Sequence, residues 1–281
     1  MEILRNLKLT GADNKPILAD VFFKMNSFNK PVVLFNHGFK GFKDYGCWNM
    51  VAEHFANEGF VFIKFNQSHN GTSTELPSDF TDLDAFGKNT FSRELTDIAK
   101  MIMWIKSNTS LPTDLMNANN ISMIGHSRGG ATAILAANQH EEITKLITWA
   151  AFKNIPERYM GPSFEEWKKN GVVYIENSRT KQQMPLSYEI YEDYMANAEY
   201  FDIENACNEI SKPQLIVHGT EDPTVIFQDA LKLKSWNKEA ELFLIPNANH
   251  VFGASHPYHG ESLPQDLALA VKESIRFLKD N

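Results

Sequence analysis

Short apolar runs alternate with helix-like patterns along most of this chain, and that alternation constrains its fold more than any other feature. Val32–Phe35 and Ile121–Ile124 are near-continuous apolar runs, typical of strands buried on both faces of a sheet. Phe91–Ser107 spaces its apolar residues three and four apart, which predicts an amphipathic helix. Because strands that alternate with helices indicate βαβ units, we expect a mainly parallel sheet covered by helices.

The other expected elements follow from the same patterns. Glu2–Thr10 and Ile17–Lys24 are joined by a short turn-rich segment with no room for a helix, which predicts an antiparallel hairpin at the N-terminus. Further strands are expected at Phe60–Phe65, Leu146–Ala151, Gln214–His218 and Glu241–Ile245. Further helices are expected at Trp48–Asn57, at Gly129–His140, around Val225–Ser235 and at the C-terminal end.

Residues 155–211 interrupt this rhythm. The stretch is rich in Tyr, Glu, Asn and Lys and is too long for a simple crossover. We expect it to be an inserted cap on a core formed by residues 1–154 and 212–281. Within the cap, Gly171–Ile175 and the region up to Tyr188 suggest a hairpin bent at Asn177-Ser178, followed by an acidic helix over Tyr191–Tyr200.

Composition excludes several classes of protein. The 281 residues carry a formal net charge of −8, which argues against binding nucleic acid because phosphate contacts need clustered Lys and Arg. Two cysteines, Cys47 and Cys207, lie far apart and predict neither a disulfide framework nor a zinc site. The N-terminal residues lack the apolar region of a signal peptide, and no apolar run reaches membrane-spanning length. We therefore expect a soluble cytoplasmic protein that does not bind membranes.

A five-residue motif, Gly125-His126-Ser127-Arg128-Gly129, matches the pattern G-x-S-x-G. Such a short pattern also arises by chance, and its serine can be a plain turn residue. Here the motif follows an expected strand and opens an expected helix, which is the strand-turn-helix setting of a nucleophile elbow. Side chains at the two glycine positions would collide where strand and helix pass closely. The motif therefore predicts Ser127 as a nucleophile held in a strained turn at the carboxyl edge of the sheet.

A serine nucleophile needs a base, because a hydroxyl group is weakly nucleophilic at neutral pH. A nucleophile elbow requires the chain order serine, then acid, then histidine. Asp222 follows one expected strand and His250 follows the last one, so both meet that order. Asp222 would accept a hydrogen bond from Nδ1 of His250 and leave Nε2 facing Ser127. Alternatively, His250 is a solvated loop residue and Asp222 caps the helix that follows it.

Acyl transfer at Ser127 also needs hydrogen-bond donors aimed at the developing oxyanion. We expect one donor to be the backbone amide of Arg128, directly after the nucleophile, and the other to be that of Phe39. Phe39 follows His37-Gly38 at the end of an early apolar strand, although this dipeptide can also be a plain strand-ending turn. The Arg128 side chain either forms a local salt bridge or binds a substrate carboxylate, and the sequence leaves both open.

Aromatic side chains follow the oxyanion strand and recur in the expected cap. They are Phe39, Phe42, Tyr45 and Trp48 after the strand, and Trp167, Tyr174 and Tyr188 in the cap. The substrate-binding candidates are Phe39, Trp167 and Tyr174, as an apolar wall for an aryl or medium acyl group. Ordinary packing in the core and cap is the alternative for at least half of the aromatic residues.

These motifs resemble those of the α/β-hydrolase superfamily, in particular its dienelactone-hydrolase-like and cinnamoyl (feruloyl) esterase-like members. The resemblance covers nearly the whole chain. It includes His37–Gly41, Asn66–Ser73, the elbow, His218–Asp222 and Asn249–Phe252. It implies the α/β-hydrolase fold, with Ser127 as nucleophile, Asp222 as acid, His250 as base, and the Phe39 and Arg128 amides as oxyanion hole. A serine nucleophile departs from the cysteine of dienelactone hydrolase itself and from the aspartate of epoxide hydrolases and dehalogenases.

We expect a serine hydrolase, a carboxylesterase that cleaves small to medium acyl esters through an acyl-enzyme on Ser127, with no metal or organic cofactor. The expected partner is a small-molecule ester. The first alternative is a serine aminopeptidase or acyl-peptidase, with the acidic stretch Glu189–Glu199 as a source of carboxylates for a substrate amine. The second is a non-catalytic hydrolase-like protein that binds a small ligand, against which the intact order Ser, Asp, His argues. The natural substrate and the oligomeric state are not determined by the sequence.

Overall fold

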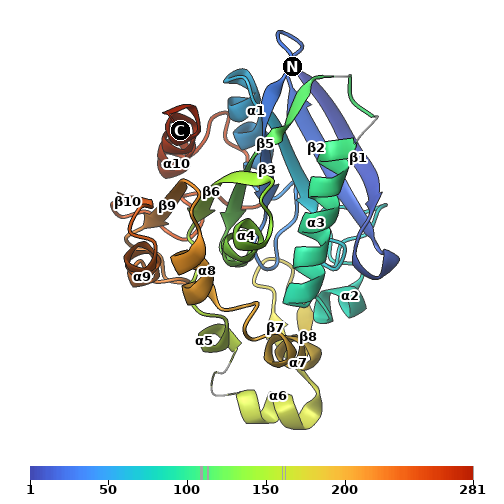
Figure 1. Ribbon diagram of the computed structural model, residues 1–281. Helices are drawn as coiled ribbons and strands as arrows, with labels where there is room; N and C mark the ends of the chain where they lie inside the picture. Colours follow the sequence, from blue (N-terminus) through green and yellow to red (C-terminus); the bar gives the residue numbers. More distant parts are fainter. Residues whose placement is uncertain (108–109, 113, 160, 162, 281) are drawn as a thin grey trace.

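The computed structural model describes residues 1–107, 110–112, 114–159, 161 and 163–280 of the chain, and its centre is a single twisted sheet (Figure 1). Eight strands lie in the order β1-β2-β4-β3-β5-β6-β9-β10. Their bounds are β1 (Glu2–Thr10), β2 (Pro16–Phe23), β3 (Lys30–Asn36), β4 (Val61–Asn66), β5 (Met116–His126), β6 (Ile143–Trp149), β9 (Gln214–Gly219) and β10 (Glu241–Ile245). Strand β2 pairs antiparallel with β1 and β4, and the remaining pairs are parallel. The predicted α/β fold with an N-terminal antiparallel hairpin is confirmed.

Helices cover both faces of the sheet (Figure 1). One face carries α1 (Trp48–Asn57) and α10 (Gln265–Asp280), and the other carries α3 (Phe91–Ser107), α4 (Arg128–Gln139), α8 (Ile203–Glu209) and α9 (Gln228–Trp236). The period of a strand divides the apolar side chains between these layers. In β3, Val32 and Leu34 join the core under α3 and α4, whereas Val33 and Phe35 join the core under α1 and α10.

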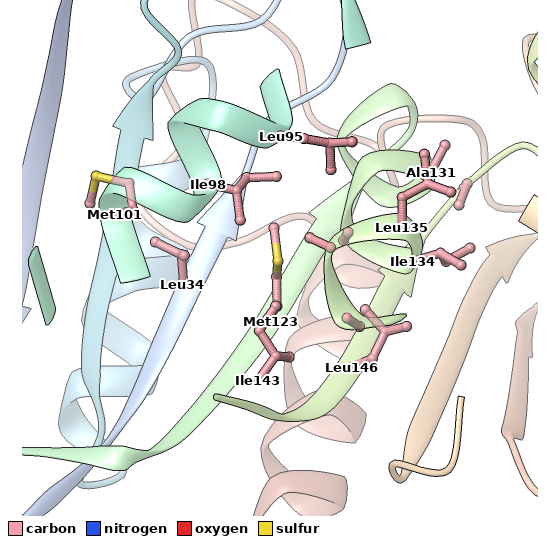
Figure 2. Close-up of a cluster of buried hydrophobic side chains, with 14 of the residues drawn as sticks. Leu34, Leu95, Ile98, Met101, Met123, Ala131, Ile134, Leu135, Ile143 and Leu146 are labelled. Carbon is pink, nitrogen blue, oxygen red and sulfur yellow. The ribbon is translucent and has the colours of Figure 1, made fainter. Parts of the chain in front are cut away.

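The larger of the two cores explains why the buried strands are so apolar. Figure 2 shows Leu34, Met123 and Leu146, from three neighbouring strands, facing the apolar stripe of α3 and the inner side of α4. Leu95 and Ile98 belong to that stripe, with the helical spacing noted in the sequence. Burial of one side chain of this size stabilises a fold by about 1.5 to 3 kcal/mol. Many such side chains in this layer therefore hold the strands and helices of the sheet firmly together.

Residues between β6 and β9 form several short elements. They are α5 (Ile155–Tyr159), α6 (Phe164–Asn170), β7 (Val172–Glu176), β8 (Gln183–Ser187), α7 (Glu189–Ala196) and α8. Strands β7 and β8 pair antiparallel, so the predicted hairpin is present, and its turn spans 177–182, closed by the Asn177 amide donating to the Gln182 carbonyl at 2.8 Å. The division into a core and a cap stays a prediction.

Several boundaries differ from the sequence-based expectations. The acidic helix is α7, Glu189–Ala196, and not Tyr191–Tyr200. Strand β5 begins at Met116, well before Ile121, and β6 ends at Trp149 because Ala150 has a positive φ of 51°. The short helices α2 (Leu83–Gly87), α5, α6 and α8 were not predicted, since one or two turns give too little periodicity to detect. Of the described helices, none is both long enough and apolar enough to cross a bilayer.

Candidate active site

Ser127 lies at the sharp turn between the end of β5 and the start of α4. Its backbone has φ 55° and ψ −120°, outside the regions that a residue with a side chain usually adopts. The Ser127 amide donates to the Trp149 carbonyl of the neighbouring strand at 2.8 Å, which holds the turn in place. A strained residue that its surroundings hold this firmly is typical of a functional site.

Glycines flank this serine because there is no room for a Cβ atom. A Cβ at Gly125 would lie 2.1 Å from the Gly129 carbonyl oxygen, and one at Gly129 would lie 2.4 Å from the carbonyl oxygens of Asn36 and His37. All of these neighbours are backbone atoms, which do not give way as a flexible side chain would. The steric reason predicted for both glycines is therefore present in the structure.

Three predicted residues meet at this turn. Nε2 of His250 lies 3.0 Å from Oγ of Ser127, and Nδ1 of His250 lies 2.7 Å from Oδ2 of Asp222. A carboxylate only accepts, so Nδ1 carries the proton, and Nε2 is free to accept from the serine hydroxyl. Asp222 follows β9 and His250 follows β10, so neighbouring parallel strands deliver them to the same edge of the sheet. The arrangement is a continuous relay from carboxylate to hydroxyl.

Asp222 is fixed by more than His250. Its Oδ1 accepts from the amides of Thr224 and Val225 at 2.8 and 2.9 Å, and its Oδ2 lies 3.3 Å from Nε2 of His218. Burial raises the pKa of Asp222, but the hydrogen bonds from His218 and His250 outweigh burial and leave that pKa well below the usual range. The residue thus orients His250 and holds the loop after it, but it does not cap the following helix, because α9 begins at Gln228 with Phe227 as its N-cap.

His126, between Gly125 and Ser127, has a role that the sequence did not indicate. Its Nε2 lies 2.9 Å from the backbone carbonyl oxygen of His250, and the two imidazole rings have centroids 4.9 Å apart. Burial, together with the charge of His250, lowers the pKa of His126 to about 3. A neutral His126 therefore donates to the His250 carbonyl and holds the backbone of the candidate base in place.

A cavity of about 450 Å³ opens over these residues. Its lining comes from the loop after β3, the serine turn, α5, the β7–β8 turn and the loop carrying His250. The lining residues are His37, Gly38, Phe39, Lys40, Gly41, Tyr45, Trp48, His126, Ser127, Arg158, Asn177, Ser178, Arg179, Thr224, His250 and Val251. This volume suits a small-molecule ligand.

The two predicted oxyanion donors lie beside Ser127. Phe39 lines the cavity, and its neighbour Gly38 packs so closely that a Cβ there would lie 3.0 Å from Cβ of Ser127. Arg128 is the first residue of α4, and the first amides of a helix have no acceptor within the helix. The Arg128 amide is thus available at the turn that carries the serine, and the assignment of both amides to an oxyanion hole stays a prediction.

The Arg128 side chain does not reach the cavity. Its Nε donates to Glu94 Oε1 at 2.6 Å, Nη2 donates to the Asn89 carbonyl at 2.6 Å, and Nη1 donates to the Tyr159 hydroxyl. The guanidinium carbon also lies 4.2 Å from the centroid of the Phe91 ring. Of the two roles left open by the sequence, the structure supports the local salt bridge.

Trp167 and Tyr174, proposed from the sequence as substrate-binding residues, are not among the described residues that line the cavity. Trp167 is buried, and its Nε1 donates to the Leu186 carbonyl at 2.8 Å. Tyr174 is 61% exposed, because the alternation along β7 turns it outward. The expectation for both residues is corrected: one packs inside the segment between β6 and β9, and the other faces solvent. Phe39 alone of the three lies at the cavity.

Several lining residues have no local signal in the sequence. Lys40, Arg158 and Arg179 come from three separate segments, and only the folded chain brings them to one cavity. Among the described residues, no group of three or more His, Cys, Asp or Glu side chains is arranged to hold a metal ion. Cys47 and Cys207 are both buried free thiols, and burial raises their pKa values to about 11 and about 12.

Comparison with known proteins gives matches at the level of sequence and of fold. A mouse (Mus musculus) protein, serine hydrolase BPHL, is 28% identical over 150 residues, which cover 49% of this chain and 52% of that relative. The match thus spans about half the length of the relative. Among solved structures, Est1E from Butyrivibrio proteoclasticus with bound ferulic acid superposes with a TM-score of 0.75 at 20% identity, covering 98% of each chain. The α/β hydrolase GrgF from Penicillium sp. sh18 superposes with a TM-score of 0.72 at 18% identity, covering 100% of this chain and 99% of that one.

The family comparison covers most of the chain. Residues 48–269 match the model of the prolyl oligopeptidase family, a span that includes the serine turn, Asp222 and His250. The structural neighbours share the α/β-hydrolase fold. The chain therefore belongs to the prolyl oligopeptidase family and is a serine hydrolase of the α/β-hydrolase fold.

Proposed function

We propose that this serine hydrolase is a carboxylesterase that cleaves small to medium acyl esters through an acyl-enzyme on Ser127. The observation that carries the proposal is the relay from Asp222 through His250 to Ser127, which ends at a cavity of about 450 Å³. A cavity of that size suits a single small ester. Ferulic acid bound to a structural neighbour, Est1E, and the aromatic lining residues Tyr45 and Trp48 are consistent with an aryl group on the substrate.

In the first half of the reaction, Oγ of Ser127 attacks the ester carbonyl carbon as Nε2 of His250 takes its proton. Asp222, ionised because its pKa is low, stabilises the imidazolium through Nδ1. The amides of Phe39 and Arg128 donate to the oxyanion, and each such donor contributes about 3 to 4 kcal/mol to the transition state. His250 then protonates the alcohol as the carbon–oxygen bond breaks.

In the second half, a water molecule enters the place of the departed alcohol. His250 takes a proton from this water, which attacks the acyl carbon and forms a second tetrahedral intermediate. The proton returns to Oγ of Ser127 as the carboxylic acid leaves. Apart from the ester and this water molecule, neither half needs a group from outside the chain.

A peptidase is the second candidate, because the family model that the chain matches is that of the prolyl oligopeptidases. An aminopeptidase would need carboxylates in the cavity to hold the substrate amine. The described lining includes none, and Glu189 at the start of the acidic stretch is paired with Arg93 at 2.7 Å. These observations favour the esterase over an aminopeptidase.

The test is hydrolysis of p-nitrophenyl esters of increasing acyl length beside aminoacyl p-nitroanilides, together with labelling by a fluorophosphonate probe. We expect ester turnover, little anilide turnover and a label on Ser127 that is lost in Ser127→Ala. Circular dichroism of the Ser127→Ala protein checks that this variant is folded. Preferred turnover of the anilides would support the peptidase. A label that persists in Ser127→Ala would refute the nucleophile, and no turnover with no label would favour a ligand-binding protein.

A further inference from the structure

The charged residues lining the cavity above Ser127 are all of one sign. Lys40, Arg158 and Arg179 line it, and no Asp or Glu is found among the lining residues that the structure describes. This is unexpected in a chain whose formal net charge is −8. The lining histidines His37 and His126 add no charge near neutral pH, since burial lowers their pKa values to about 4 and about 3. The cavity is thus a local positive site on an acidic protein.

These three cations have no carboxylate partner within the described part of the chain. Nη1 of Arg158 donates to the Thr224 carbonyl at 2.8 Å, the Arg179 guanidinium lies 5.7 Å from the centroid of the Phe42 ring, and the Lys40 amine lies 5.8 Å from that of Phe39. The Thr224 carbonyl and the Phe42 and Phe39 rings contact these side chains, but none of these partners carries a negative charge to neutralise them.

Neighbouring cations behave differently. Lys181, two residues beyond Arg179 in the same turn, pairs with Glu176 at 2.9 Å and does not line the cavity. Arg128, beside the nucleophile, pairs with Glu94 at 2.6 Å. Unlike these two neighbours, Lys40, Arg158 and Arg179 remain available for a ligand.

Asp222, which contacts the lining residue His250, does not cancel this charge. Asp222 is only 5% exposed, and its two oxygens are occupied by the Thr224 and Val225 amides, His218 and His250. Lys40 is half-buried, and burial lowers its pKa, so an anion beside it would relieve an unfavourable desolvation. Guanidinium groups such as those of Arg158 and Arg179 match the geometry of a carboxylate.

We propose that the ester cleaved at Ser127 carries a carboxylate, in its acyl or its alcohol portion, which Arg179, Arg158 and Lys40 bind. This inference rests on the proposed esterase function and names its substrate class. A substrate with a positive charge is disfavoured by the same three residues. The role that the sequence offered to Arg128, binding a substrate carboxylate, thus falls to residues from the loop after β3, from α5 and from the β7–β8 turn.

The test uses pairs of esters that differ only in one carboxylate. The acyl-side pair is p-nitrophenyl hexanoate and the mono-p-nitrophenyl ester of adipic acid, which has the same chain length. The alcohol-side pair is phenyl hexanoate and p-carboxyphenyl hexanoate. Each kcat/KM is divided by the rate of hydroxide-catalysed hydrolysis of the same ester, so that only recognition by the protein remains.

We expect the carboxylate ester of at least one pair to be preferred by about tenfold or more, as for one hydrogen bond to a charged group. The preference should fall several-fold in Arg179→Gln, Arg158→Gln and Lys40→Gln, and should disappear in the triple variant. Lys181→Gln removes the same charge from the same turn outside the cavity, and should keep the preference. Added salt should reduce the preference, because it screens charges at an exposed cavity mouth.

Equal or slower hydrolysis of the carboxylate ester in both pairs would overturn the inference while leaving the esterase intact. The same holds if the preference survives in the triple variant. If no ester is hydrolysed and the fluorophosphonate leaves Ser127 unlabelled, the esterase itself is refuted. The two failures are therefore distinguishable in one set of assays.

Discussion

Nε2 of His126 donates a hydrogen bond to the backbone carbonyl of His250, with 2.9 Å between the two heavy atoms. The contact joins the serine turn after β5 to the loop after β10, and it fixes the backbone of the candidate base, His250, next to Ser127. The ring centroids of His126 and His250 are 4.9 Å apart, and those of His126 and Trp48 are 5.7 Å apart. His126 is thus a positioning residue that acts through His250.

Replacing His126 by Phe keeps a ring in this stack and removes the donor. We expect kcat for the best ester to fall about tenfold with KM nearly unchanged, because the loss of one positioning contact misaligns the reacting groups. Because His126 stays neutral above its pKa of about 3, the shape of the pH profile above pH 4 should not change. His126→Gln, which restores a donor, should recover part of the rate. A variant with normal kcat and lowered thermal stability would assign His126 a purely structural role.

Arg128 and Glu94 form an ion pair that is almost completely buried. Burial raises the pKa of Glu94, and the pair with Arg128 opposes that rise, although the pKa stays above its usual value. Replacing Arg128 by Met leaves a carboxylate buried without its partner. We expect this to lower the free energy of unfolding by about 3 to 5 kcal/mol, measured by urea denaturation.

The double variant Arg128→Met, Glu94→Leu is the control for this pair. It removes both charges, so it should recover much of the stability that the single variant loses. The preference for carboxylate esters should be the same in the double variant and in the unmodified protein, because the Arg128 side chain does not line the cavity. Loss of that preference with full stability would return the ligand-binding role to Arg128.

Local signals explain which parts of the molecule could be predicted from the sequence. The apolar run of β3 and the helical spacing of Phe91–Ser107 are complete within a few residues, and α3 has the predicted bounds. The position of Ser127 could be predicted because glycines on both sides record the close approach of strand and helix. The order of Asp222 and His250 after it follows from the order of parallel strands.

The cavity lining could not be predicted in the same way. Arg158 and Arg179 lie on a short helix and in a hairpin turn, and no local pattern specifies which loops meet above Ser127. Trp167 and Tyr174 were misassigned because an aromatic side chain suits packing within a cap, an exposed strand face and a substrate wall equally well. Deciding among these uses needs the tertiary structure.

Gly129 should not tolerate a side chain. A Cβ there would lie 2.4 Å from two backbone carbonyl oxygens, those of Asn36 and His37, and forcing such overlap displaces β3 or α4. We expect Gly129→Ala to lose more than about 3 kcal/mol of unfolding free energy, at the upper end of overpacking. Gly161→Ala is the control, since a Cβ at Gly161 would have no atom within 4 Å among the described residues. Equal stability of the two variants would contradict the steric argument.

Asp20 anchors a buried charge network with Lys43 and Lys64. It pairs across strands with Lys64 of β4, and both Lys43 and Lys64 place Nζ at 2.9 Å from its carboxylate. Both lysines are 1% exposed or less in their side chains. Burial raises the pKa of Asp20, but the charge of Lys64, the amide of Asn6 and the charge of Lys43 outweigh burial and hold that pKa well below its usual range.

This low pKa predicts how stability changes with acid. A carboxylate whose pKa is depressed by folding contributes its full stability above the pKa of the unfolded chain, about 3.9 for Asp, and loses it as pH falls toward the folded value. We expect the unfolding free energy, measured by urea denaturation, to drop steeply below about pH 4. Asp20→Asn should be less stable at pH 7 by up to about 3 to 5 kcal/mol, because it removes the more buried of the two carboxylates, Asp20 and Asp44, that Lys43 and Lys64 share. The same variant should lose less further stability between pH 4 and pH 2 than the unmodified protein, and an equally steep loss in both would show that other carboxylates control the acid transition.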